Sequence, residues 1–104
     1  MGSAGHDWDA VPEREAGNGV WSKTLVGDGV VFRHLRLKAG TEAAPHDHPH
    51  EQWLHVLSGR ATVRCDDGEH ELRAGVMLHL PAHTRHAATF HEETVMVEIN
   101  VTGG

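Results

Sequence analysis

The chain has 104 residues, a length that fits one compact domain with a modest core and is too short for two. Its 9 basic and 15 acidic side chains give a net charge of −6, which argues against a nucleic-acid-binding surface. No stretch approaches the roughly 18 apolar residues of a membrane-spanning helix, and the first residues lack the features of a secretory signal. The single cysteine, Cys65, cannot form an internal disulfide, which is typical of a reducing compartment. We therefore expect a cytoplasmic protein with no nucleic-acid or membrane partner.

Residues 1–19 are polar and rich in turn-forming residues. We expect them to form a loose N-terminal arm with room for one strand. We expect residues 20–104 to form the single folded domain.

From Val20 onward, short apolar runs alternate with turn signals at intervals of eight to twelve residues. The runs have strand length and β-branched content, and they cover residues 30–37, 52–57, 61–65, 76–80 and 94–101. The first strictly alternating example is Ala61, Val63 and Cys65; another is the run that ends at Val101. Evenly spaced short strands without a helical apolar stripe predict an all-β sandwich or small barrel.

Histidine is unusually abundant. The chain contains 11 histidines, and eight of them fall between His46 and His86. Histidine is the commonest metal ligand and the side chain that titrates nearest neutral pH. The cluster therefore indicates either a metal site or a pH-sensitive surface.

The spacing within this cluster favours the metal site. His46 and His48 are two positions apart, so in an extended chain both imidazoles face the same side, and Gln52 keeps that parity. An antiparallel neighbour could bring His86 opposite them. Nitrogen and oxygen ligands on adjacent strands can hold a divalent transition metal ion and leave coordination positions open.

Two sequence patterns resemble the paired motifs of the cupin superfamily. The patterns are Gly40-x5-His46-x-His48-x3-Gln52-x6-Gly59 and Gly75-x5-Pro81-x-His83-x2-His86. The resemblance implies a small jelly-roll-like barrel, the double-stranded β-helix, with the metal held by His46, His48, Gln52 and His86. Among small single-domain cupins, the sequence looks most like the pectin-degradation (uronate) type and the polyketide-cyclase type.

Three positions depart from the cupin pattern. Gln52 replaces the usual glutamate, His83 the usual glycine, and Phe90 the expected asparagine. Three neutral imidazoles and a neutral carboxamide would leave the 2+ charge of the ion uncompensated. This favours an anionic or enolate-like substrate and a Lewis-acid role for the ion. Zinc, nickel, iron, manganese and copper all remain candidates.

Two further residues are candidates for proton transfer. His34 shares a strand face with Phe32 and Arg36, and we expect it to line the barrel mouth as a general acid or base. Glu98 occupies the position that resembles an aspartate of the uronate-type cupins. For both residues, the alternative is a solvated or interface side chain without a catalytic role.

The leading hypothesis is a metal-dependent enzyme that acts on a small, oxygen-rich molecule by Lewis-acid and proton-transfer chemistry. Isomerisation, ring opening, cyclisation and dehydration share that first step. The alternatives are an Fe(II)-dependent dioxygenase and a non-catalytic small-molecule-binding protein. Trp53 and Leu57 alternate out of phase with the ligand face, so we expect them on the exterior, in a homodimer interface.

Overall fold

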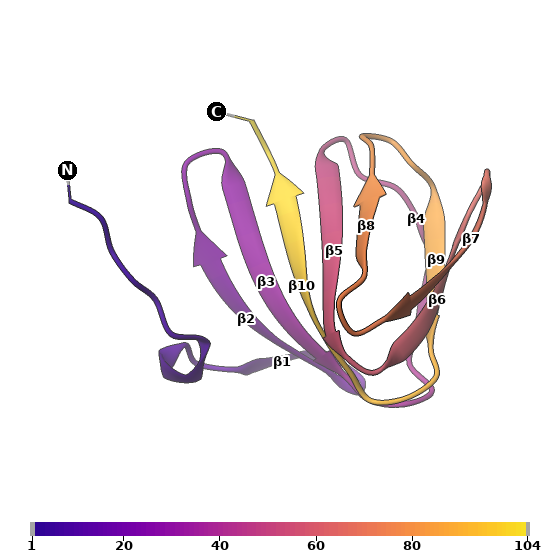
Figure 1. Ribbon diagram of the computed structural model, residues 1–104, viewed down its shortest axis with the longest axis horizontal. Coiled ribbons are helices and arrows are strands. Elements are labelled where there is room, and N and C mark those ends of the chain that lie inside the picture. The colour runs from indigo at the N-terminus through magenta and orange to yellow at the C-terminus, as the bar shows by residue number, and fades with distance from the viewer. Residues whose placement is uncertain (1, 104) are drawn as a thin grey trace.

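The protein folds into two antiparallel sheets, and the computed structural model describes residues 2–103. The six-stranded sheet has the order β1-β2-β3-β10-β5-β8, and the four-stranded sheet has the order β4-β9-β6-β7. Figure 1 shows the two sheets curving around a shared interior. The elements are η1 (Trp8–Ala10), β1 (Arg14–Gly17), β2 (Val20–Val26), β3 (Val30–Leu37), β4 (Glu42–His46), β5 (Glu51–Ser58), β6 (Arg60–Cys65), β7 (Gly68–Arg73), β8 (Met77–Leu80), β9 (His86–Phe90) and β10 (Thr94–Val101).

The core lies between the two sheets and is built from alternating side chains of both. Val56 of β5 and Val63 of β6 are almost fully inaccessible to solvent. Period-two alternation directs every second residue of a strand inward, so a few aliphatic side chains from each strand fill the interior. The buried apolar cluster is Leu35, Leu37, Leu54, Val56, Ala61, Val63, Leu72, Leu78, Leu80, Ala88, Phe90 and Met96.

The predicted all-β, jelly-roll-like barrel is confirmed, and every predicted run coincides with a strand except for Val76, which precedes β8. The runs 30–37 and 94–101 coincide with β3 and β10. The predicted runs did not include β4, β7 or β9. In β7 only Leu72 is buried, so this strand has almost no apolar periodicity to detect.

One turn depends on a glycine in a conformation that other residues rarely adopt. Gly59 links β5 to β6 with φ +95°. A Cβ at this position would lie 2.4 Å from the backbone oxygen of Glu93 and 2.6 Å from Cα of Thr94. Only a residue without a Cβ allows β10 to begin this close to the turn.

The inward face of β10 is not its β-branched face. Val95, Val97, Ile99 and Val101 point outward, whereas Met96, Glu98 and Asn100 point into the barrel. The polar residues face inward because they line a cavity at one end of the barrel. Glu98 is therefore not the solvent-facing strand residue of the alternative interpretation.

The N-terminal segment follows the outer side of the six-stranded sheet. Within the expected arm, β1 pairs with β2, and Lys23 Nζ donates a 2.9 Å hydrogen bond to the backbone oxygen of Trp8. Arg36 forms a 2.8 Å ion pair with Glu13. Across residues 2–103, no helix has the length and apolar character needed to cross a membrane.

Candidate metal centre

Three imidazoles converge at one end of the barrel. His46 at the end of β4 is the cross-strand partner of His86 at the start of β9, and His48 follows β4 by two residues. One ring nitrogen from each of the three histidines lies within 4.8 Å of the other two. The ring centroids are 4.3 Å apart for His46 and His86, 4.8 Å for His46 and His48, and 5.5 Å for His48 and His86. The structure therefore brings together the three histidines that the sequence placed at a common site.

Backbone carbonyls fix the orientation of two of these rings. His46 Nδ1 donates to the backbone oxygen of Ala44 at 2.7 Å, and His86 Nδ1 donates to that of Thr84 at 2.9 Å. With Nδ1 protonated, the lone pair of each ring lies on Nε2, the nitrogen on the far side of the ring from the carbonyl. A carbonyl partner on the second ring nitrogen is the usual way in which proteins orient a metal-binding histidine.

The surroundings also favour the neutral, metal-binding form of the rings. Burial lowers the pKa of His48, and the neighbouring His46, His50 and His86 lower it further. Burial likewise lowers the pKa of His86. Metal ions bind the unprotonated imidazole, so these shifts leave the lone pairs available at neutral pH.

Gln52 reaches the same space from the other sheet. It is 3% exposed, and its Nε2 donates a 2.9 Å hydrogen bond to Asn100 Oδ1. Asn100 Nδ2 in turn donates to the backbone oxygen of Val31 at 3.4 Å. Because Asn100 presents its oxygen to Gln52, the Nε2 end of the Gln52 side chain faces Asn100. The Oε1 of Gln52 is left to act as an acceptor or ligand.

His50 joins this network, which sequence reasoning did not predict. Strict alternation would turn His50 away from the ligand face, but the chain bends at Pro49 and His50 before β5 begins. As a result, His50 Nε2 donates to Asn100 Oδ1 at 3.0 Å, and its ring stacks on that of His48. The adjacent proline was the available signal, because proline interrupts extended parity.

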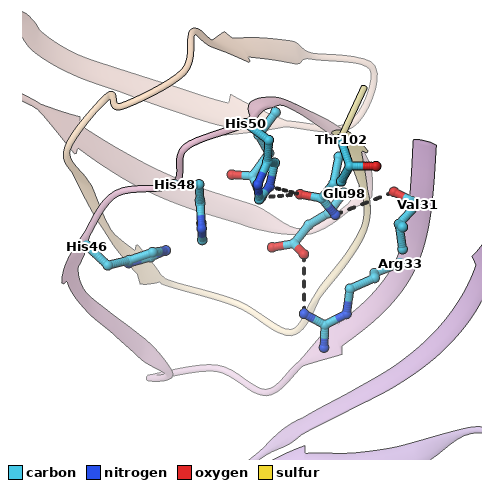
Figure 2. Close-up of a pocket in the computed structure, with 9 residues that line it drawn as sticks. Val31, Arg33, His46, His48, His50, Glu98 and Thr102 are labelled. Carbon is cyan, nitrogen blue, oxygen red and sulfur yellow. Dashed lines mark hydrogen bonds and ion pairs between the residues drawn. The ribbon is translucent and has the colours of Figure 1, made fainter. Parts of the chain in front are cut away.

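The carboxyl group of Glu98 lies in the same cavity. Burial raises the pKa of Glu98, while the guanidinium of Arg33, 3.6 Å away, opposes the rise. In Figure 2, Glu98 and Arg33 lie across the cavity from His46 and His48. A largely buried carboxyl group with a raised pKa can hold a proton closer to neutral pH than an exposed glutamate does.

Two cavities meet at these residues. The outer cavity has a volume of about 380 Å³ and is lined by the residues drawn in Figure 2. A smaller space of about 50 Å³ lies deeper and is lined mainly by core side chains such as Leu54, Val63 and Phe90. His46, Gln52 and Glu98 line both spaces. The polar groups thus separate an open mouth from an apolar interior.

The structure does not bring His34 to this site. His34 is the cross-strand partner of Val97 and points to the outer face of the sheet, where its ring lies 5.3 Å from that of Trp8. The alternating residues Arg33 and Val31 occupy the cavity instead. The expectation that His34 lines the barrel mouth therefore fails, because the opposite face of β3 is the inner one.

Residues 33–102 match the family model described as "Cupin domain". The chain belongs to the cupin family. No curated protein sequence gives a significant match.

Solved structures share the fold of this cupin at low sequence identity. An RmlC-like cupin from Shewanella frigidimarina is 19% identical with a TM-score of 0.88, over 98% of this chain and 93% of that one. KdgF from Halomonas sp. is 20% identical with a TM-score of 0.84, over 92% of each chain. Ectoine synthase from P. lautus is 17% identical with a TM-score of 0.84, over 96% of this chain and 78% of that one. The resemblance to a small single-domain cupin is confirmed.

One departure of this cupin from the family pattern lies in the loop before β9. His83, at the position where a glycine is usual, adopts a left-handed backbone conformation with φ 66°. Its backbone N–H donates to the backbone oxygen of His48. The loop before β9 is thereby tied to the segment that carries two of the three clustered histidines.

Proposed function

We propose that this cupin binds a divalent transition metal ion through His46, His48, His86 and Gln52 Oε1. We further propose that it catalyses proton transfer on a small, oxygen-rich molecule. The observation that carries the proposal is the convergence of three imidazoles, two of them oriented by backbone carbonyls, beside a carboxyl group with a raised pKa, where the two cavities meet. The donor set fits such an ion, because it offers unprotonated imidazole nitrogen and a carboxamide oxygen.

A bound divalent ion would supply Lewis acidity toward a carbonyl or enolate oxygen of the substrate. The chain's own residues would do the rest. In its neutral form, Glu98 would donate a proton to the substrate, and in its ionised form it would accept one. The guanidinium of Arg33 would orient an anionic group of the substrate and would stabilise Glu98 once it is ionised.

The charges around the cavity favour an anionic substrate. The four proposed ligands are neutral in their metal-binding forms, so they leave the charge of the ion uncompensated. Arg33 adds a further positive charge at the wall of the cavity. The outer volume of about 380 Å³ suits a small organic acid.

Structural similarity shows that enzymes share this fold, but it does not identify the reaction of this chain. Solved structures of the same fold include an ectoine synthase and an oxalate decarboxylase from Bacillus subtilis, each 16–17% identical to this chain. We infer that this chain uses the shared barrel for isomerisation, ring opening, cyclisation or dehydration. We place it in the cytoplasm, since a single cysteine suits a reducing compartment.

The first test is elemental analysis of the protein as purified without an affinity tag. We expect the variant His48→Ala to contain about one zinc, nickel or manganese ion per chain fewer than the unchanged protein. The second test is NMR detection of deuterium exchange next to the carbonyl of small keto and hydroxy acids. Exchange that survives both chelation and Glu98→Gln would contradict the proposal.

Two other results would replace the proposal with an alternative. Iron in the purified protein, together with substrate-dependent oxygen uptake, would make the protein an Fe(II)-dependent dioxygenase. Tight binding of a small acid without turnover under any metal would make it a binding protein.

A further inference from the structure

We propose that Cys65, Asp67 and His70 form a second cation site on this cupin, selective for zinc-like ions that accept a thiolate ligand. The proposed site shares no residue with the histidine cluster at the barrel mouth. It therefore does not depend on the function proposed above.

The three residues belong to the hairpin that joins β6 to β7. Cys65 pairs with Gly68 across the hairpin, and Val63 pairs with His70. Cys65 and Val63 are two positions apart on β6, so their side chains point to the same face. His70 shares that face as the cross-strand partner of Val63, and the thiol and the imidazole therefore lie on one side of the sheet. The sulfur, one ring nitrogen and one Asp67 oxygen all lie within 4.8 Å of one another.

No side chain stands opposite the thiol of Cys65 on β7. Gly68 stands opposite Cys65, and a Cβ built on Gly68 would meet no atom within 4 Å. Cys65 and His70 are half-buried, whereas Asp67 is exposed. Within residues 2–103, none of the ion pairs uses Asp67 or His70. An ion can therefore bind the three donors without breaking an ion pair.

The donor types and the local charge select the kind of ion. Metal–ligand distances of about 2.0–2.3 Å place tetrahedral donors roughly 3.5 Å apart, so a small inward movement of the exposed Asp67 closes the site. A thiolate and an imidazole favour zinc, cobalt and related ions over magnesium or calcium. Asp66 adds a second carboxylate next to Asp67 in the turn, which favours binding of a cation.

The position of this hairpin sets the site beside the histidine cluster. Cys65 is the cross-strand partner of His86 on β9, and the two side chains share one face of the four-stranded sheet. The ligand sets nonetheless differ in chemistry, since one is built on a thiol and the other on imidazoles and a carboxamide. The two sites can therefore be distinguished by spectroscopy.

The experiment uses cobalt(II) as the probe, with chelator-stripped, phosphine-reduced full-length protein. The background variant His46→Ala/His48→Ala removes the histidine cluster and keeps the hairpin. We expect it to bind about one cobalt ion per chain, with the near-ultraviolet charge-transfer absorption of a cobalt–thiolate bond. Addition of Cys65→Ser should abolish this absorption. Binding of no cobalt, or binding without the absorption, would overturn the proposal.

Matched variants assign the remaining ligands. Loss of an outer-shell partner alone costs about 10–100-fold in affinity, so loss of a ligand through Asp67→Asn or His70→Ala should cost at least about tenfold. Asp66→Asn removes the same charge next to Asp67 and should cost much less. Equal losses for the two aspartate variants would overturn the assignment of Asp67 as a ligand.

A second measurement does not depend on the folding of the double variant. In the otherwise unchanged protein, calorimetric titration with cobalt should give two ions per chain, and Cys65→Ser should give one. An unchanged stoichiometry in Cys65→Ser would overturn the second site.

Discussion

Gln52 and Asn100 are cross-strand partners on β5 and β10, and a 2.9 Å hydrogen bond joins their side-chain amides inside the barrel. Asn100 Oδ1 also accepts from His50 Nε2, and its Nδ2 donates to the backbone of β3. One asparagine therefore determines which end of Gln52 faces the three histidines.

This relationship makes Asn100 a positioning residue for the proposed metal site. Asn100→Ala keeps all four proposed ligands but leaves Gln52 Nε2 without its acceptor. We expect metal affinity to fall by about 10–100-fold, as for other outer-shell partners. Calorimetric zinc titration measures the loss. Asn100→Asp is the matched control, because it keeps an acceptor oxygen for Gln52 and should retain more of the affinity; equal losses for both variants would contradict the prediction.

Glu98 should lower the stability of the metal-free protein at neutral pH. Burial raises its folded-state pKa above the ordinary value of 4.5, so the folded state resists ionisation. The stability that depends on the protonated form is present below pH 4.5 and is lost as pH rises through the folded pKa. We expect Glu98→Gln to raise the urea midpoint at about pH 7 and to have little effect at about pH 4. A lower midpoint at pH 7 would show that the ion pair with Arg33 outweighs the burial.

His34 should have the opposite pH dependence. Desolvation lowers its folded-state pKa below 6.5, and the nearby Lys23 lowers it further. Its contribution to stability is therefore fully present above pH 6.5 and is lost as pH falls toward the folded pKa. Thermal unfolding between about pH 7.5 and about pH 5.5 should show a smaller loss of Tm in His34→Leu than in the unchanged protein. An identical loss in the two proteins would contradict this assignment.

Gly59→Ala should destabilise the fold strongly. The added Cβ would collide with the backbone of Glu93 and Thr94, and the left-handed conformation adds its own strain. We expect a loss of about 3 kcal/mol in the free energy of unfolding, measured by urea denaturation. Gly40→Ala is the control: Gly40 has φ +87°, and its Cβ would meet no atom within 4 Å. It should cost only about 1 kcal/mol, and equal losses would show that the collision is relieved elsewhere.

We also propose that the outer face of the six-stranded sheet mediates homodimerisation. Leu25, Phe32, Ile99 and Trp53 are successive cross-strand partners on that face, and none of them is fully buried in the single chain. Light scattering on a sizing column should give a dimer, and Trp53→Arg should give a folded monomer. Val26→Arg adds the same charge at a position that is already 76% exposed, and it should leave the dimer intact. A monomer for the unchanged protein would refute the proposal.

The sequence predicted the strands and the histidine cluster for a simple physical reason. Alternation in the β5 run placed Gln52, Leu54 and Val56 on one face, and all three are buried. The i, i+2 spacing of His46 and His48 required only local extended backbone, which β4 and the segment after it provide. Period-two patterns are properties of a single strand, so they can be recognised in a sequence without knowledge of the whole fold.

The remaining features depended on the tertiary fold. The predicted face of β3 was wrong for His34, because alternation separates two faces without saying which one lies inside. In β10 the outward face is the more apolar one, so a hydrophobicity pattern alone would place Glu98 in solvent. The contact of His50 with the site was not predicted, because the bend at Pro49 interrupts the alternation of side-chain direction. The partnership of Gln52 with Asn100, 48 residues apart, appears only when the strands are paired.

His46 and His86 belong to the four-stranded sheet, whereas Gln52, Glu98 and Asn100 belong to the six-stranded one. The distance across the site is therefore set by the thickness of the apolar layer between the sheets. A methylene added or removed at Leu54 or Val63, which line the inner cavity without being proposed ligands, would change that separation. Ion selectivity in this barrel is thus open to tuning by substitutions that leave every coordinating atom in place.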